Sequence, residues 1–135
     1  MALLIDSSPI ITLERRGQEA AISALAGLGE QAAIAAITVS ELLTGAYRAD
    51  SPARRRVREQ FVGTLLQTFP TLSFDLPAAQ VHARIWAELT TAGQIIGPHD
   101  LIIAATALAQ GYDVLMDNVR EFERVPGLTV RRPER

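Results

Sequence analysis

Four positions along the chain carry acidic or amide side chains where polar chemistry could be concentrated. Asp6 ends an apolar run at the N-terminus, Glu41 lies just after a second run, and Asp117 with Asn118 follows a later one. Asp100 opens the most apolar helical segment. Several carboxylates held within a few ångströms repel one another and raise each other's pKa. A divalent cation removes that conflict, and oxygen ligands suit Mg²⁺ or Mn²⁺.

Each of these acids also has an ordinary structural role open to it. Asp6 could close an Asx turn with the backbone that follows it, and Thr38 with Glu41 fits a helix capping box. Asp100 could complement a helix dipole, and the polar pair after the later apolar run could belong to a loop. These alternatives stay open for each position taken alone. One shared divalent cation site, however, would account for all of the positions together.

The elements that would position these residues alternate along the chain. Strands are predicted at Ala2–Ile5, Ala33–Ile37, Thr71–Leu76, Tyr112–Met116 and Leu128–Arg131. Helices are predicted at about 8–16, 18–28 (stopped by Gly29), 38–48, 51–69, 77–93 and 98–110, with a short helical turn at Val119–Arg124. This alternation indicates an α/β fold with a mainly parallel central sheet flanked by helices. The functional crevice of such a sheet lies beyond the carboxyl ends of its strands, where the acids fall.

The helix predicted between Pro98 and Gly111 is apolar almost all round. A helix without a polar stripe must be buried, so we expect it at the centre of the fold. Asp100 in its first turn would be a costly charge unless it is paired, capped or bound to metal.

Composition restricts the remaining possibilities. The chain of 135 residues, 48% of them hydrophobic, is expected to form a single domain over residues 1–135. The absence of cysteine excludes disulfides and thiolate zinc sites, and it is compatible with a reducing cytoplasm. The N-terminal run lacks a basic segment and suggests a strand instead of a signal peptide. No apolar run has the length of a membrane span, so we expect a cytoplasmic protein without a membrane partner.

Five segments together resemble the PIN-domain family, and within it the VapC toxins of bacterial toxin–antitoxin pairs. These segments are Leu3–Ser8, Thr38–Ala46, His99–Leu108, Asn118–Phe122 and Val125–Leu128. The resemblance runs from about residue 3 to residue 130 in order and spacing. It implies a three-layer fold and a metal-dependent ribonuclease, usually a homodimer, that a VapB-like antitoxin holds inactive.

The resemblance also implies roles for individual residues. Asp6 and Asp100 would bind Mg²⁺ or Mn²⁺, with Glu41 as a third acid of the same site, and Asn118 aligns best with the fourth position. Weaker candidates are Asp117, Glu121, Ser7 and Ser40, the two serines either as contacts to phosphate or water or as helix caps. His99 is expected to lie outside the reacting groups. The chain departs from the family pattern at Met116, where many relatives have Thr.

Four arginines near the start of the predicted helix 51–69 are a further candidate for binding. Arg54, Arg55, Arg56 and Arg58 could contact RNA phosphates or an acidic antitoxin segment, or they could form a solvated face.

Two other functions compete with a ribonuclease toxin. A catalytically silent domain that still binds RNA or antitoxin is conceivable because of Met116. A phosphatase with an aspartate nucleophile is disfavoured, because Ser8 stands where such an enzyme usually has its second acid.

Overall fold

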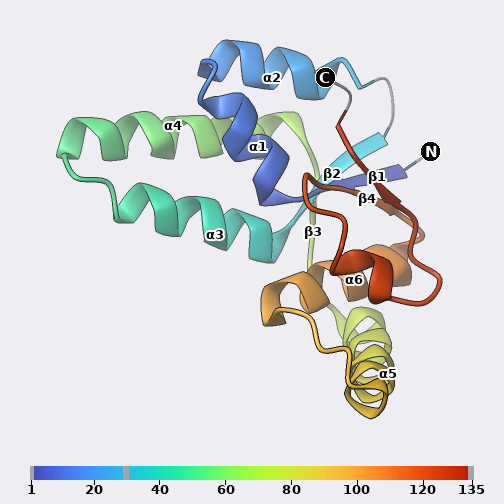
Figure 1. The fold of residues 1–135 in the computed structure, drawn as a ribbon. Helices are drawn as coiled ribbons and strands as arrows, with labels where there is room; N and C mark the ends of the chain where they lie inside the picture. Colours follow the sequence, from blue (N-terminus) through green and yellow to red (C-terminus); the bar gives the residue numbers. More distant parts are fainter. Residues whose placement is uncertain (1, 29–30, 134–135) are drawn as a thin grey trace.

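The computed structural model describes residues 2–28 and 31–133. Its central sheet consists of parallel strands in the order β3-β2-β1-β4-β5 (Figure 1). The strands are β1 (Ala2–Ile5), β2 (Gln31–Ala35), β3 (Thr71–Leu72), β4 (Asp113–Leu115) and β5 (Val130–Arg131). The helices are α1 (Ser7–Glu14), α2 (Gln18–Ala26), α3 (Ala36–Tyr47), α4 (Pro52–Thr68), α5 (Leu76–Ala92) and α6 (Pro98–Gln110), followed by a 3₁₀ turn at Phe122–Arg124.

Alternation of side chains along the strands gives the sheet two buried faces. Leu4 and Val114 point into a core built with α5 and α6, whereas Leu3, Ile5 and Ile34 point into a core built with α1 to α4. The two groups of helices lie on opposite sides of the sheet in Figure 1. The predicted three-layer α/β fold with a mainly parallel sheet is therefore confirmed.

The helix α6 is central, as its apolar sequence predicts. Its residues Ile103 to Ala107 are buried without interruption. The helix begins after Gly97, which provides no side-chain cap, and ends at Gly111, whose φ of 74° is readily accessible to glycine. Asp100 consequently enters the interior at the first turn of a well-packed helix.

Several predicted boundaries are wrong, and side-chain capping explains two of them. The helix α1 begins one residue early because Asp6, and not Ser8, is its N-cap. The strand β3 stops at Leu72 and cannot extend to Leu76 as predicted, because Leu76 is the first residue of α5 and Asp75 caps that helix by accepting a hydrogen bond from the Ala78 N–H.

The other corrections concern strand and helix ends. The strand β2 lies two residues earlier than predicted, so α3 begins at Ala36 and includes Thr38. Alanine is a weak strand former and a strong helix former, which favours the helix at this junction. The strands β4 and β5 and the turn before Val125 are shorter than predicted. The predicted stop of the second helix at Gly29 lies outside the described residues. Among the helices of the described residues, none is both long and apolar enough to cross a membrane.

Adjacent leucines on α4 provide a matched test of this packing. Leu65 is 1% exposed and Leu66 is 44% exposed. Leu65→Ala should lower the free energy of unfolding by about 2–5 kcal/mol, because it leaves a cavity in the core. Leu66→Ala should change it by less than about 1 kcal/mol. Urea denaturation followed by circular dichroism measures both, and equal losses would contradict the assigned orientation of α4.

Candidate acidic site at the edge of the sheet

The first acid of the site, Asp6, is fixed where β1 passes into α1. Its side chain is 4% exposed, and Oδ2 accepts hydrogen bonds from the Ser8 N–H at 3.3 Å and the Ser8 hydroxyl at 3.0 Å. The possible Asx turn is thus present, but it uses only one carboxylate oxygen. The other oxygen, Oδ1, is buried and has no hydrogen-bond partner among the described residues. Burial is the main cause that raises the pKa of Asp6, against the hydrogen bonds from Ser7 and Ser8 that lower it.

The second acid, Glu41, lies on α3 and is not used for helix capping. The helix begins at Ala36 after an N-cap without a side-chain hydrogen bond, so the capping box with Thr38 is wrong. Glu41 Oε2 lies 3.4 Å from His99 Nδ1, while Oε1 is buried and has no partner among the described residues. Glu41 therefore presents a carboxylate oxygen that the fold leaves unsatisfied.

The third acid, Asp100, shows the strongest electrostatic perturbation. Burial and a side-chain hydrogen bond with Glu121 raise its pKa to about 7, and the charges of Asp6, Glu121 and Glu41 add to the effect. Four carboxyl groups from separate parts of the sequence thus influence one another at this edge. Burial and these neighbouring carboxyl groups therefore all favour the protonated form of Asp100.

The segment after β4 supplies the remaining candidates, and their positions differ. Asn118 is exposed and its Oδ1 accepts a hydrogen bond from the Arg120 N–H at 3.3 Å, within its own turn. Glu121, a weaker candidate from the sequence, instead approaches Asp100. The buried Phe122 holds this turn against the core. That aromatic residue next to an acid is the sequence signal that could have favoured Glu121.

Asp117 lies between these residues and Asp6. Its N–H donates to the Ser8 hydroxyl at 3.2 Å, and its Oδ2 accepts from the Thr12 hydroxyl at 3.0 Å. Its charge also contributes to the raised pKa of Asp6. Asp117 is therefore part of the acidic edge, on the α1 side.

The two serine candidates differ in their relation to the acids. The backbone N–H of Ser7 hydrogen-bonds Asp6, where it stabilises the carboxylate. Ser40 is exposed on α3, and its carbonyl accepts from the Thr44 hydroxyl.

Three of the four arginines near the start of α4 already have partners. Arg54 pairs with Asp50, and Arg55 pairs with Glu59 and lies over the ring of Tyr47. Arg58 donates to the Gly45 carbonyl at 2.9 Å. The cluster therefore does not form one free cationic surface.

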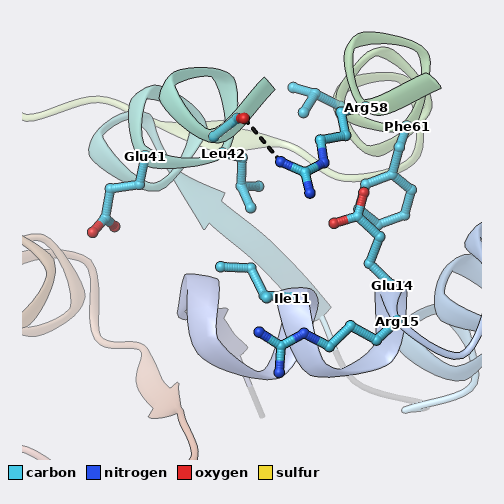
Figure 2. Close-up of a pocket in the computed structure, with 9 residues that line it drawn as sticks. Ile11, Glu14, Arg15, Glu41, Leu42, Arg58 and Phe61 are labelled. Atoms are coloured by element: carbon cyan, nitrogen blue, oxygen red, sulfur yellow. Dashed lines mark hydrogen bonds between the residues drawn. The ribbon is translucent and has the colours of Figure 1, made fainter. Parts of the chain in front are cut away.

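A groove of about 260 Å³ opens between α1, α3 and α4 (Figure 2). Apolar side chains of Ile11, Leu42 and Phe61 line it together with the charged side chains of Glu14, Arg15, Glu41 and Arg58. Glu41 therefore belongs both to the groove and to the acidic site. A molecule lying in the groove would contact Glu41.

The donor set suits a hard divalent cation. Asp6 and Glu41 each keep a buried, unpartnered oxygen, and carboxylates are the ligands that Mg²⁺ and Mn²⁺ prefer. Within residues 2–28 and 31–133, however, no three acidic or histidine side chains are close enough to form a closed metal site. These side chains would have to draw together around a cation, whose charge would favour the ionised form of Asp100.

The raised pKa of Asp100 predicts a pH dependence of stability in EDTA. Its usual pKa is 3.8, so between about pH 4 and 7 the folded protein holds a proton that the unfolded chain has lost. This contribution to stability is complete at low pH and disappears as the pH rises through 7. Asp100→Asn removes this contribution, so the variant should lose less stability than the wild type as the pH rises. The melting temperature of the variant minus that of the wild type should therefore increase by about 3 °C or more from pH 5 to pH 8.

Thermal denaturation over this pH range measures the difference. Glu123→Gln, which changes an exposed acid near the same edge, serves as the control and should follow the wild type. A constant difference between Asp100→Asn and the wild type would contradict the raised pKa.

Comparison with known proteins places this geometry in a family. A model of the PIN domain matches residues 3–128. Ribonuclease VapC1 of Rickettsia felis is 37% identical over 130 residues, which cover 96% of this chain and 95% of that protein. The tRNA(fMet)-specific endonuclease VapC of Salmonella typhimurium is 39% identical over 98 residues, covering 72% and 71% of the two chains. A chain in the crystal structure of DNA-bound VapBC from Salmonella typhimurium superimposes with a TM-score of 0.81 at 28% identity, covering 98% of each chain. The chain therefore belongs to the PIN-domain family, and within it to the group of the VapC ribonucleases.

Proposed function

We propose that this chain is a metal-dependent endoribonuclease that acts as the toxin of a VapBC-type toxin–antitoxin pair. The observation that carries the proposal is the approach of Asp6, Glu41 and Glu121 to Asp100, whose pKa burial and these neighbours raise to about 7. A fold tolerates such a concentration of like charge when function requires it. The ribonuclease and endonuclease names of its relatives support the same reaction. Because its substrate is RNA, we expect it to act in the cytoplasm.

In this proposal, Asp6, Glu41 and Asp100 hold Mg²⁺ or Mn²⁺, and Glu121 completes the acidic set. When bound, the cation would activate water and offset the charge of the scissile phosphate. The Ser8 hydrogen bonds keep one oxygen of Asp6 fixed, so its other oxygen remains directed to the site. Asn118 contributes to the turn that brings Glu121 to Asp100. His99 lies at the exposed side of Glu41 and is not needed as a base.

The silent-domain alternative is less favourable. Its basis is Met116, which is buried and packs in the core on the α5 and α6 side of the sheet. The acids themselves are all present and close enough to perturb Asp100. A domain without turnover would have no reason to retain this electrostatic cost.

The groove of Figure 2 is the proposed binding surface for the antitoxin. Its apolar side chains suit one face of a helix, and its charges suit a segment that also carries charged groups. A cation of that segment could reach Glu41, which lies at the end of the groove nearest the other acids. Binding there would inhibit the enzyme by occupying its carboxylates. Structures of related VapBC complexes support a protein partner of this kind.

A second copy of this chain is the proposed partner of an apolar surface on α5. Trp86 is 56% exposed and Ile95 is 64% exposed, beside a hollow of about 390 Å³ between α5 and α6. His82 is the only side chain lining the hollow that can carry a charge. Such a surface offers little to the phosphates of RNA but suits an identical apolar surface across a two-fold axis.

Cleavage of RNA by the purified chain, free of antitoxin, tests the proposed activity. We expect cleavage with Mg²⁺ or Mn²⁺ and none in EDTA. Asp100→Asn should lower the rate by at least about 100-fold, because loss of a ligand costs more than loss of an outer partner. Glu121→Gln should also lower it, whereas the control Glu123→Gln should not. Cleavage that persists in EDTA or in Asp100→Asn would refute the proposed chemistry.

Light scattering of the purified chain tests the homodimer. The wild type should have the mass of a dimer, and Trp86→Glu should shift it toward the monomer, because a buried unpaired charge opposes association. Val57→Glu on α4, which is 50% exposed in the wild type, serves as the control. A monomeric wild type, or a dimer that Trp86→Glu leaves intact, would rule out this interface.

A further inference from the structure

The corner of the site after β4 begins with a buried apolar residue. Met116, directly before Asp117, is 5% exposed within the core. The side chain at this position therefore cannot hold a neighbouring acid by a hydroxyl hydrogen bond. Another part of the chain would have to supply that contact.

Hydroxyl groups on α1 occupy the required position. Thr12 Oγ1 donates to Asp117 Oδ2 at 3.0 Å, across 105 positions of sequence. Ser8 Oγ accepts from the Asp117 N–H at 3.2 Å and donates to Asp6 Oδ2 at 3.0 Å. Ser8 and Thr12 are separated by four residues and so share one face of the helix. A continuous series of hydrogen bonds thus joins Asp6, Ser8, Asp117 and Thr12.

We infer that Thr12 is a positioning residue that holds the carboxylate of Asp117 beside Asp6, while Ser8 holds the Asp117 backbone, and that Asp117 is a further acid of the site on the α1 side. The inference rests on the proposed function. Asn118, which aligns with the family position, is exposed and accepts a hydrogen bond within its own turn. The hydroxyls of α1 thus supply the contact that the Met116 side chain cannot make.

The contact has a direct consequence for the acidic edge. A carboxylate that accepts a hydrogen bond from a fixed donor loses rotational freedom and keeps its remaining oxygen in one direction. Without Thr12, the Asp117 side chain could rotate away from Asp6 and reduce their mutual repulsion. Thr12 therefore preserves an arrangement that favours a cation and disfavours the empty site.

Binding of Mn²⁺ to the full chain, measured by titration calorimetry, tests this role without relying on catalysis. Thr12→Val keeps the shape of the side chain and removes its donor, so the dissociation constant should rise about 10-fold or more. Thr12→Ser, which keeps the hydroxyl, should restore most of the affinity. Thr64→Val makes the same change on exposed α4, where the hydroxyl donates to the Gln60 carbonyl, and should leave affinity unchanged.

A double-mutant cycle separates positioning from a general structural effect. Asp117→Asn should weaken Mn²⁺ binding, and Thr12→Val should add little in its presence, because Thr12 acts through Asp117. The inference would be overturned if the losses of Mn²⁺ affinity were additive, or if either Thr12→Val or Asp117→Asn left the affinity unchanged. RNA cleavage by the wild type would still uphold the proposed function in that case. A wild type that neither binds Mn²⁺ nor cleaves RNA would refute both.

Discussion

Repulsion among carboxyl groups at one edge of the sheet is the constraint on which the rest of this structure depends. Asp6, Glu41, Asp100 and Glu121 come from different parts of the sequence, and burial together with the neighbouring carboxyl groups raises the pKa of Asp100 to about 7. Packing of α3 and α6 on the two faces of the sheet opposes this repulsion. A cation would satisfy the unpartnered oxygens of Asp6 and Glu41 and offset the repulsion.

The same geometry connects catalysis with inhibition. Glu41 is a member of the acidic site and also lines the groove between α1, α3 and α4 (Figure 2). In the proposed toxin, an antitoxin segment in that groove would act on the acids directly, without a conformational change elsewhere. The apolar surface near Trp86 lies on α5, which packs on the other side of the sheet, so the proposed association of two copies would leave the groove accessible (Figure 1).

The segment after β4 shows how a distant helix can support an acid. Met116 contributes to the core, and the hydroxyls of Ser8 and Thr12 on α1 contact Asp117. A hydrogen bond depends on where a donor lies in space, so a residue 105 positions away can contact Asp117 as directly as a sequence neighbour.

Local patterns in the sequence predict the alternating helices and parallel strands and the candidate acids Asp6, Glu41 and Asp100, because hydrophobic periodicity and strand ends are local properties. The ion pairs of Arg54 with Asp50 and of Arg55 with Glu59 also have a local i,i+4 spacing. The contact of Arg58 with the Gly45 carbonyl, in contrast, depends on how α3 and α4 pack. The folded chain likewise shows Asn118 exposed within its own turn and Glu121 beside Asp100, because the arrangement of a turn against the core is not contained in any local pattern.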